Sequence, residues 1–391
     1  AGDVYTVGNF SGTADFDPGS GQFNLIGAGP DIFVSKLDAL GDFVWAKQMG
    51  GPGDDAAQAI TLDAGGDLLL TGYFRGAADF DPGPGTYVLT AAGGLGESDA
   101  FVCRMDPTGA LVWAAGMGGE GRDIGYAIAL DGLGNVHTTG SFTGTADLDP
   151  GPGVHDLVSA SAIDRNIYVS KLDANGSFEW AALIGGTNAG DGLGIAVDAN
   201  GSVYTTGFFN GTFDMDPGPG DQLLTAAGIA DAYISKLDAD GLFGWAAQLS
   251  GAGQLGGSAL AVEANGTCYA TGFFFGTADL DPGPGTVNLT APPNTALTYV
   301  VRLADPSTGT ISEQRPTDAL IVRQDAFDGR LTVHGTSAME ELVLFDALGR
   351  VVHRASPNST IHLMEVRNTG LHILRATMGG RSLSHRIVLV H

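Results

Sequence analysis

Paired aspartates recur at a fixed place in the first 310 residues, inside a run of the form D-x-D-P-G-x-G. On an extended chain, residues two apart project to the same side, so the two carboxylates of a pair can converge. The Pro-Gly turn that follows exposes backbone carbonyls, and carboxylate and carbonyl oxygens are the ligands that Ca²⁺ prefers. The pattern predicts five calcium sites, formed by Asp15 and Asp17, Asp79 and Asp81, Asp147 and Asp149, Asp214 and Asp216, and Asp279 and Asp281.

A purely structural role for the same aspartates stays open. Aspartate is a common turn residue because its carboxylate accepts hydrogen bonds from nearby backbone amides. Five pairs that cap five identical turns would leave the same pattern in the sequence. The run also lacks the third acid and the distal glutamate of an EF-hand loop.

The repetition argues against an enzyme. A catalytic site uses unlike residues in unlike roles, so one copy should carry unmatched nucleophiles, bases or carboxylates. The departures from the repeat are few, namely Arg122, His137, His155, Asp164 and Arg165. No Ser-His-Asp elbow, zinc motif or phosphate loop occurs. We expect no catalytic activity. The alternative is a glycoside hydrolase, which needs only two carboxylates about 5 to 10 Å apart.

The paired aspartates belong to a longer repeat. Their spacing along the chain is 64, 68, 67 and 65 residues, and other marks keep the same register. These marks are an S-K-L-D-type segment, an alternating apolar run such as AITLDAGG, and a tryptophan in four copies (Trp45, Trp113, Trp180 and Trp245). A fixed period of this length indicates a repeat architecture. We expect the tryptophans to lie in the apolar cores of the units.

Each unit is predicted to form four short antiparallel strands. Segments such as NVHTTGSF and IYVSKLD cluster β-branched and aromatic residues, and D-x-x-G turns separate them. No apolar pattern keeps a 3.6-residue period, so helices should be nearly absent. The pattern favours an all-β fold with a five-bladed β-propeller over residues 1–310. A parallel β-helix is less suitable because its coils are much shorter than these units.

Both ends of the repeat region are incomplete. The chain starts at VYTVG, the second strand of a unit, and the fifth copy has no tryptophan strand. We expect the two ends to meet in one blade and close a five-bladed ring. The alternative is an open ring, in which residues before Ala1 supply more strands or an exposed strand edge pairs with another copy of the chain.

Composition divides the chain near residue 310. Residues 1–310 hold 9 Lys and Arg against 36 Asp and Glu, whereas residues 311–391 hold 9 Arg and 8 acids. This break predicts a second domain over residues 311–391. The formal net charge of −26 disfavours nucleic acid and anionic membranes as partners, because phosphate would be repelled. Two cysteines exclude a disulfide scaffold, and no apolar run approaches the roughly 20 residues of a membrane span.

The repeat resembles a known family. The run DIFVSKLDALGDFVWAKQMGGPGDDAAQAITLDAGGDLLLTG, from Asp31 to Gly72, is similar to the bacterial β-propeller repeat of large secreted proteins. The resemblance extends over all five copies. It implies the propeller fold and carries no activity, since that repeat family has no shared catalytic residues.

The tail has its own pattern. LIVRQ, RLTVHG, LVLFDALGRVVHR, IHLMEV, GLHILRATMGG and HRIVLVH alternate apolar and polar residues between breaks, which predicts about seven short strands and a small Ig-like β-sandwich. Residues 344–352, 370–375 and 386–390 resemble the C-terminal sorting domain of the type IX secretion system of the Bacteroidetes. The motif positions are Asp346, Gly349, Arg350, Gly370 and Arg386, and His372 stands where the family more often has tyrosine. An ordinary Ig-like module is the alternative.

These observations together predict a secreted protein without catalytic activity. The resemblance of the tail implies export by the type IX secretion machinery, followed by cleavage and by attachment to the cell surface or release. Five equal loops favour an adhesin, a scaffold or a subunit of an extracellular assembly, because equal sites give avidity. The alternative is a lectin that binds surface glycans through the same loops. Copies of the chain itself are a further possible partner through an open blade edge.

Overall fold

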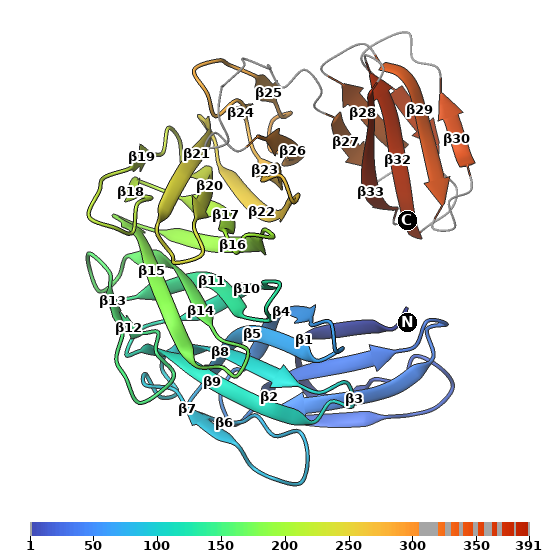
Figure 1. Cartoon of the computed structure of the whole chain (residues 1–391). Coiled ribbons are helices and arrows are strands. Elements are labelled where there is room, and N and C mark those ends of the chain that lie inside the picture. Colours follow the sequence, from blue (N-terminus) through green and yellow to red (C-terminus); the bar gives the residue numbers. More distant parts are fainter. Residues whose placement is uncertain are drawn as a thin grey trace.

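A computed structural model describes residues 2–304 and, between residues 320 and 389, the strands given below. Every element among these residues is a β-strand, so the prediction of an all-β fold without helices is confirmed for this part of the chain (Figure 1). In particular, no described element is an apolar helix of the length needed to cross a membrane.

Three central sheets contain six antiparallel strands each. Four strands of a sheet come from one stretch of chain, and a short hairpin from the next repeat extends the sheet at its outer edge. The second sheet contains β4 (Ala56–Leu62), β5 (Leu68–Arg75), β8 (Ser98–Met105), β9 (Leu111–Gly119), β12 (Thr145–Asp147) and β13 (Asp156–Val158). The third contains β10 (Ile124–Leu130), β11 (Val136–Thr143), β14 (Arg165–Leu172), β15 (Phe178–Gly186), β18 (Thr212–Asp214) and β19 (Leu223–Thr225). The fourth contains β16 (Gly190–Val197), β17 (Val203–Phe209), β20 (Asp231–Leu237), β21 (Phe243–Gly251), β24 (Thr277–Asp279) and β25 (Asn288–Thr290).

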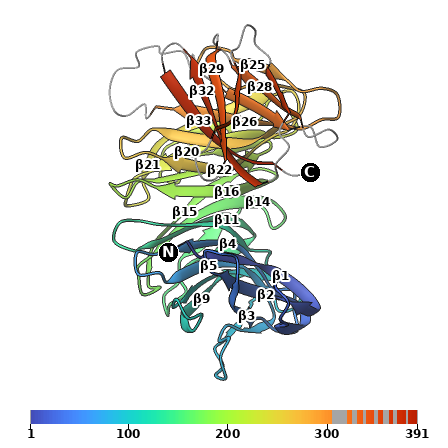
Figure 2. The same ribbon diagram turned by 90° about the vertical axis from the view of Figure 1, so that its right-hand side faces the viewer.

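The first and fifth sheets have three strands each. The first contains β1 (Val4–Asp15), β2 (Asn24–Leu37) and β3 (Phe43–Met49), and the hairpin of β6 (Ala77–Asp79) and β7 (Val88–Thr90) lies at its outer edge. The fifth contains β22 (Leu255–Val262), β23 (Cys268–Phe274) and β26 (Leu297–Leu303). The five sheets follow one another in chain order, as the two views at right angles show (Figures 1 and 2).

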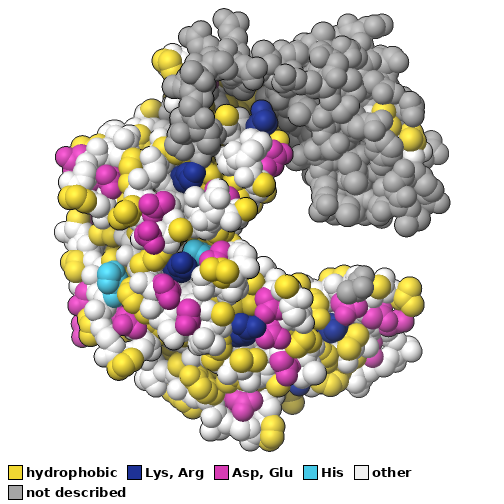
Figure 3. All heavy atoms as spheres, viewed as in Figure 1, with side chains coloured by type: hydrophobic (Ala, Val, Ile, Leu, Met, Phe, Trp, Pro, Cys, Tyr) yellow, Lys and Arg dark blue, Asp and Glu magenta, His cyan; other side chains and the backbone are white. Residues whose placement is uncertain are grey.

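The predicted closure of the ring is not found. Strands β1 to β3 do not pack against the strands of the fifth sheet, and the described part of the chain forms an open crescent (Figure 3). The reason lies in which strands of a repeat unit the two end sheets contain. The first sheet holds the second to fourth strands of a unit and the fifth holds the first to third, so the middle strands are present twice. The two sheets therefore cannot merge into one four-stranded blade.

The apolar core lies between neighbouring sheets. On β5, Leu68 and Leu70 contact the cluster shared with the first sheet, whereas Leu69 contacts the cluster shared with the third sheet. On β8, Phe101 and Val102 are divided in the same way. Because successive side chains of a strand point to opposite faces, a strand with a sheet on each side needs a continuous apolar run. This explains segments such as LLL in β5.

The repeated tryptophans pack at the joints between sheets. All four contact apolar clusters, as predicted (Trp45, Trp113, Trp180 and Trp245). In addition, Trp113 of β9 donates its indole N–H to the carbonyl of Ala174, in the turn between β14 and β15 of the next sheet, at 3.4 Å. Trp180 of β15 donates in the same way to the carbonyl of Ala239 at 3.0 Å. In these two copies the tryptophan therefore connects its sheet to a turn of the next sheet.

Replacing Gly176 by alanine should weaken the joint that Trp113 forms. Gly176 has a φ of +84°, and a Cβ there would lie 3.0 Å from the indole ring of Trp113. We expect a loss of about 1–2 kcal/mol from the left-handed backbone alone, and a further loss from the contact, in chemical denaturation. Gly134→Ala is the matched control, because Gly134 has a φ of +83° and its nearest contact would be 3.8 Å away. Equal losses in the two variants would show that the indole contact contributes nothing.

The tail contains seven strands in two sheets among its described residues. One sheet consists of β27 (Leu320–Gln324), β28 (Arg330–Gly335) and β31 (His362–Glu365). The other consists of β30 (Val351–Ala355), β29 (Met339–Asp346), β32 (Gly370–Met378) and β33 (Arg381–Leu389). The predicted domain boundary at residue 310 lies outside the described residues. Sandwich packing of the two tail sheets stays a prediction.

Candidate functional site

The D-x-D loops lie on the hairpins that extend the outer edges of the sheets. In the hairpin β6–β7, the backbone amide and carbonyl of Asp79 exchange hydrogen bonds of 2.9 Å with those of Gly50, the residue that follows β3. The hairpins β12–β13, β18–β19 and β24–β25 are attached to β9, β15 and β21 in the same manner. The loop of one repeat thus completes the sheet of the repeat before it. In the first copy, the loop joins β1 directly to β2.

The two aspartates of each pair accept backbone hydrogen bonds in a fixed pattern. In the second copy, Oδ1 of Asp79 accepts from the amides of Asp81 at 3.0 Å and Tyr87 at 2.8 Å, and Oδ1 of Asp81 accepts from the amide of Gly83 at 2.8 Å. The other four copies repeat these three bonds within 0.1 Å. The structure therefore gives every pair the turn-capping contacts that the sequence left as an alternative.

Two further positions of the motif are explained by the structure. One is the residue between the two aspartates, and the other is the final glycine. Phe80, between Asp79 and Asp81, is fully buried, and its equivalents Leu148, Met215 and Leu280 are buried too. Since successive residues of a strand point to opposite faces, an inward Phe80 places both aspartates outward. A Cβ at Gly85 would overlap Oδ2 of Asp81, so a larger residue at that position would displace the Asp81 carboxylate.

The calcium sites stay a prediction. The structure brings the two aspartates of each pair into one turn, as predicted, but their Oδ1 atoms are engaged by backbone amides, which leaves the Oδ2 atoms for a cation. Among the described residues, no three His, Cys, Asp or Glu side chains gather into a group that could hold a metal ion. A calcium ion in a D-x-D loop would therefore need backbone carbonyls or water for most of its six to eight oxygen ligands.

A second set of aspartates, which sequence reasoning missed, is buried at the joints between the first three sheets. Asp31, Asp55, Asp99 and Asp123 are all less than a tenth exposed. Burial raises the pKa of Asp55 and of Asp99 to about 6 and that of Asp123 to about 8, and it also raises the pKa of Asp31. For Asp31 and Asp99 a signal existed, because an aspartate stands four residues before three of the S-K-L-D-type segments (Asp31, Asp99 and Asp231). Nothing in the sequence showed that these aspartates face another sheet.

Three of the residues that break the repeat, His137, His155 and Arg165, form side-chain contacts within the fold. His137 of β11 is fully buried, and desolvation by burial lowers its pKa to about 4 although its Nε2 lies 3.6 Å from Oδ2 of Asp131. Arg165 forms an ion pair of 3.1 Å with Asp191 at the joint between the third and fourth sheets. The ring of His155 packs against a phenylalanine of β15. Each of these three side chains therefore has a packing or ion-pair contact in the fold.

The motif positions of the tail lie on neighbouring strands where they are described. Asp346 of β29 is paired with residue 372 of β32, and Arg386 of β33 is paired with residue 373 of β32. Gly370 begins β32. The three segments that carry the sorting resemblance therefore meet in one sheet. Gly349 and Arg350 lie outside the described residues.

Sequence comparisons find distant relatives of part of the chain. No protein-family model matches the chain. The chain is 22 % identical over 228 residues to an uncharacterized WD repeat-containing protein of Acanthamoeba polyphaga mimivirus, which is 52 % of this chain and 16 % of that protein. It is 28 % identical over 146 residues to the regulatory protein FlaEY of Caulobacter vibrioides, which is 37 % of this chain and 15 % of that protein. WD repeats form propeller blades, so the first match agrees with the repeated sheets.

Structure comparisons give weaker likenesses. A protein of unknown function from Bacteroides caccae has a TM-score of 0.34 and 9 % identity, over 93 % of this chain and 99 % of that one. PorZ, a surface component of the type-IX secretion system of Porphyromonas gingivalis, has a TM-score of 0.31 and 11 % identity, over 99 % of this chain and 51 % of that one. Both TM-scores are too low to assign a role. The sheets and the WD-repeat match together are consistent with propeller blades in an all-β repeat protein.

Proposed function

We propose that the chain is a secreted or surface-attached structural or adhesion protein without catalytic activity, exported by the type IX secretion machinery. The observation that carries the proposal is the recurrence of one loop geometry five times along the crescent. Equal sites at regular spacing suit multivalent attachment, because each further contact is made at a high effective concentration. A catalytic centre would instead need unlike groups in one place. The sorting resemblance of the tail supports the export route.

Deletion of residues 311–391 tests the export route. In a bacterium with an active type IX system, the full chain should reach the outer surface or the medium, and the shortened chain should stay in the periplasm. Arg386→Ala, in the segment that resembles the sorting motif, should also reduce export. Equal surface amounts of the full and the shortened chain would contradict the proposal.

Glycan binding by the same loops is the second candidate. Aromatic side chains stand eight residues after the first aspartate in the first two copies, and Phe23 and Tyr87 are 38 % and 43 % exposed. Each ring offers an apolar face beside the polar aspartates of its loop, and a sugar ring could stack on such a face. A glycan array on the purified chain separates the candidates, because a scaffold should show no saturable binding. Light scattering of the same sample measures self-association, since a monomer has a mass of 39.8 kDa.

Calcium binding at the D-x-D loops forms part of this proposal and predicts a higher melting temperature in millimolar calcium than in EDTA. A ligand at 100 times its dissociation constant adds about 2.7 kcal/mol per occupied site. An asparagine Oδ1 can accept the two amide bonds of Asp79, so Asp79→Asn keeps the turn cap and removes the charge. That variant should lose about a fifth of the EDTA effect, while Asp79→Ala should in addition lose stability in EDTA. An EDTA-insensitive wild-type protein would leave the turn cap as the role of the pair.

A further inference from the structure

Two pairs of buried aspartates lie face to face at successive joints. At the joint of the first and second sheets, Oδ1 of Asp31 and Oδ2 of Asp55 lie 2.7 and 2.9 Å from the point that a Cβ on Gly50 would occupy. At the next joint, Oδ1 of Asp99 and Oδ2 of Asp123 lie 2.9 and 2.6 Å from the corresponding point on Gly118. The glycine leaves the space in which the two carboxyl groups approach each other.

One oxygen of the first pair has no partner. Asp55 accepts hydrogen bonds from the amides of Gly51 at 2.7 Å and Arg75 at 3.0 Å. Oδ2 of Asp31 accepts from the side-chain amide of Gln48 at 2.7 Å. Oδ1 of Asp31, which faces Asp55, is buried without a hydrogen-bond partner. An unpartnered buried oxygen on a charged group is costly, and a second carboxylate beside it increases the cost.

The second pair repeats this arrangement. Oδ2 of Asp123 accepts from the amide of Gly119 at 2.7 Å, and Oδ2 of Asp99 accepts from the amide of Ala92 at 2.9 Å. Oδ1 of Asp99, which faces Asp123, again has no partner, and Oδ1 of Asp123 has none either. A proton on one of the two carboxyl groups of a pair turns an acceptor into a donor toward the facing carboxylate. We propose that each of these two joints holds one proton between its paired carboxyl groups, and that loss of this proton loosens the first three sheets from one another.

The surrounding groups favour a proton over a metal cation. The backbone amides at each pair direct N–H groups, not oxygens, toward the carboxylates, whereas calcium takes six to eight oxygens. Among the residues that the structure describes, no lysine or arginine forms an ion pair with any of the four aspartates. The charged groups that act on Asp55 and Asp123 from outside the pairs are Asp54 and Glu97, and both are acidic. The guanidinium of Arg75 lies 3.8 Å from Asp54.

The third joint has a neutral side chain at the position of Asp99, and a glycine, Gly190, at the position of Asp123. Asn166 takes the place of Asp99, since each is paired with a phenylalanine at the end of the preceding strand of its sheet. The side-chain amide of Asn166 is buried and donates to the carbonyl of Gly186 at 3.2 Å. A neutral donor is therefore accepted at this position, and a protonated Asp99 would resemble it.

The direction of the pH dependence follows from the raised pKa values. An unfolded aspartate releases its proton at about pH 4, whereas the pKa of Asp99 is about 6 and that of Asp123 about 8 in the folded chain, because burial disfavours the charged form. The folded state therefore binds more protons than the unfolded state between these values. The contribution of the pairs to stability is therefore greatest at acid pH and falls as the pH rises, by about tenfold in the unfolding constant per pH unit for each proton held.

Denaturation of the full chain between about pH 5 and 8 tests the proposal. We expect Asp99→Asn to remove one proton from the pH dependence. Below about pH 6, the logarithm of its unfolding constant should rise with pH by about one unit less per pH unit than that of the wild type. Asp240→Asn, an exposed aspartate, is the control and should keep the wild-type slope. The contribution of the buried His137 is common to all variants and cancels in this comparison. Equal slopes in Asp99→Asn and Asp240→Asn would overturn the proposal.

A second measurement needs no variant. Infrared spectra of the wild-type protein should show a protonated carboxyl band near pH 6 that disappears as the pH is raised to about 9. Absence of this band, or its loss at pH 6 on addition of millimolar calcium, would show that the pairs hold no proton or that a cation replaces it. Either result contradicts the proposal, even if Asp99→Asn does not fold.

Discussion

Replacing Phe80 by alanine is expected to lower the free energy of unfolding by about 3–5 kcal/mol. The side chain is fully buried, and its ring centroid lies 5.5 Å from that of Phe74 and 4.9 Å from that of Phe101. Its removal would leave a cavity in the cluster between the first and second sheets, and that cluster cannot collapse freely because both sheets are held by backbone hydrogen bonds. Phe80 also stands between the paired Asp79 and Asp81, so the same change should loosen the loop that they form.

Urea denaturation of the full chain measures this effect. Val88→Ala is the matched control, because Val88 lies in the same hairpin and is 57 % exposed. It should change the free energy of unfolding by no more than about 0.5 kcal/mol. If both variants lose the same amount, the hairpin and not the buried ring determines the stability. If Phe80→Ala loses less than about 1 kcal/mol, the middle residue of the motif is not a core anchor.

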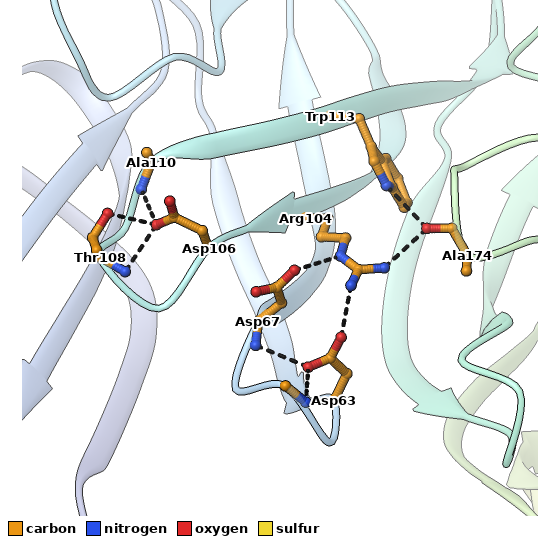
Figure 4. A network of polar contacts seen from close by, with 9 residues as sticks. Asp63, Asp67, Arg104, Asp106, Thr108, Ala110, Trp113 and Ala174 are labelled. Atoms are coloured by element: carbon orange, nitrogen blue, oxygen red, sulfur yellow. Dashed lines mark hydrogen bonds and ion pairs between the residues drawn. The ribbon is translucent and has the colours of Figure 1, made fainter.

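Arg104→Met is expected to cost about 2 kcal/mol, within the range for breaking a partly buried ion pair. The guanidinium of Arg104 contacts three acceptors (Figure 4). Its Nε lies 2.9 Å from Oδ2 of Asp67, its Nη2 lies 2.7 Å from Oδ2 of Asp63, and its Nη1 donates to the carbonyl of Ala174 at 3.0 Å. The first two contacts close a turn in the second sheet, and the third reaches the third sheet. Methionine keeps the apolar stem but leaves both carboxylates without their cation.

Arg104→Lys separates charge from geometry. Lysine is the natural residue at the equivalent positions Lys36, Lys171 and Lys236. A single ammonium group cannot bond to three acceptors in a plane, so this variant should fall between wild type and Arg104→Met. If the free energy of unfolding of Arg104→Lys equals that of the wild type, only the charge matters. Equal stabilities in all three proteins would show that the network is too exposed to contribute.

Much of the local structure was predictable from the sequence. The alternating segments became strands, the D-x-x-G segments became turns between them, and the D-x-D pairs became capped turns, because these features depend on hydrogen bonds between residues close in the chain. The carboxylate of Asp79 reaches amides only two and eight residues away. Because the motif recurs in every copy, the same turn was expected in each, and all five loops have it.

The contacts between sheets were not predictable in the same way. A sequence pattern shows which residues lie on one face of a strand, but not which sheet covers that face. For this reason, the sequence did not show that Asp99 is buried opposite Asp123 while Asp173 caps an exposed turn. The indole of Trp113 likewise finds its acceptor 61 residues further along the chain.

Ring closure shows most clearly the difference between local structure, which was predictable, and contacts between sheets, which were not. The sequence by itself determined that the chain is an all-β repeat protein, with strands and turns in a regular order and a tail of different composition. Only the tertiary structure decided that the first and fifth sheets do not join, which aspartates lose contact with water, and which side chains connect one sheet to the next. The physical reason is that strand and turn formation depend on local hydrogen bonding and alternation, whereas burial and closure depend on how whole sheets pack against each other.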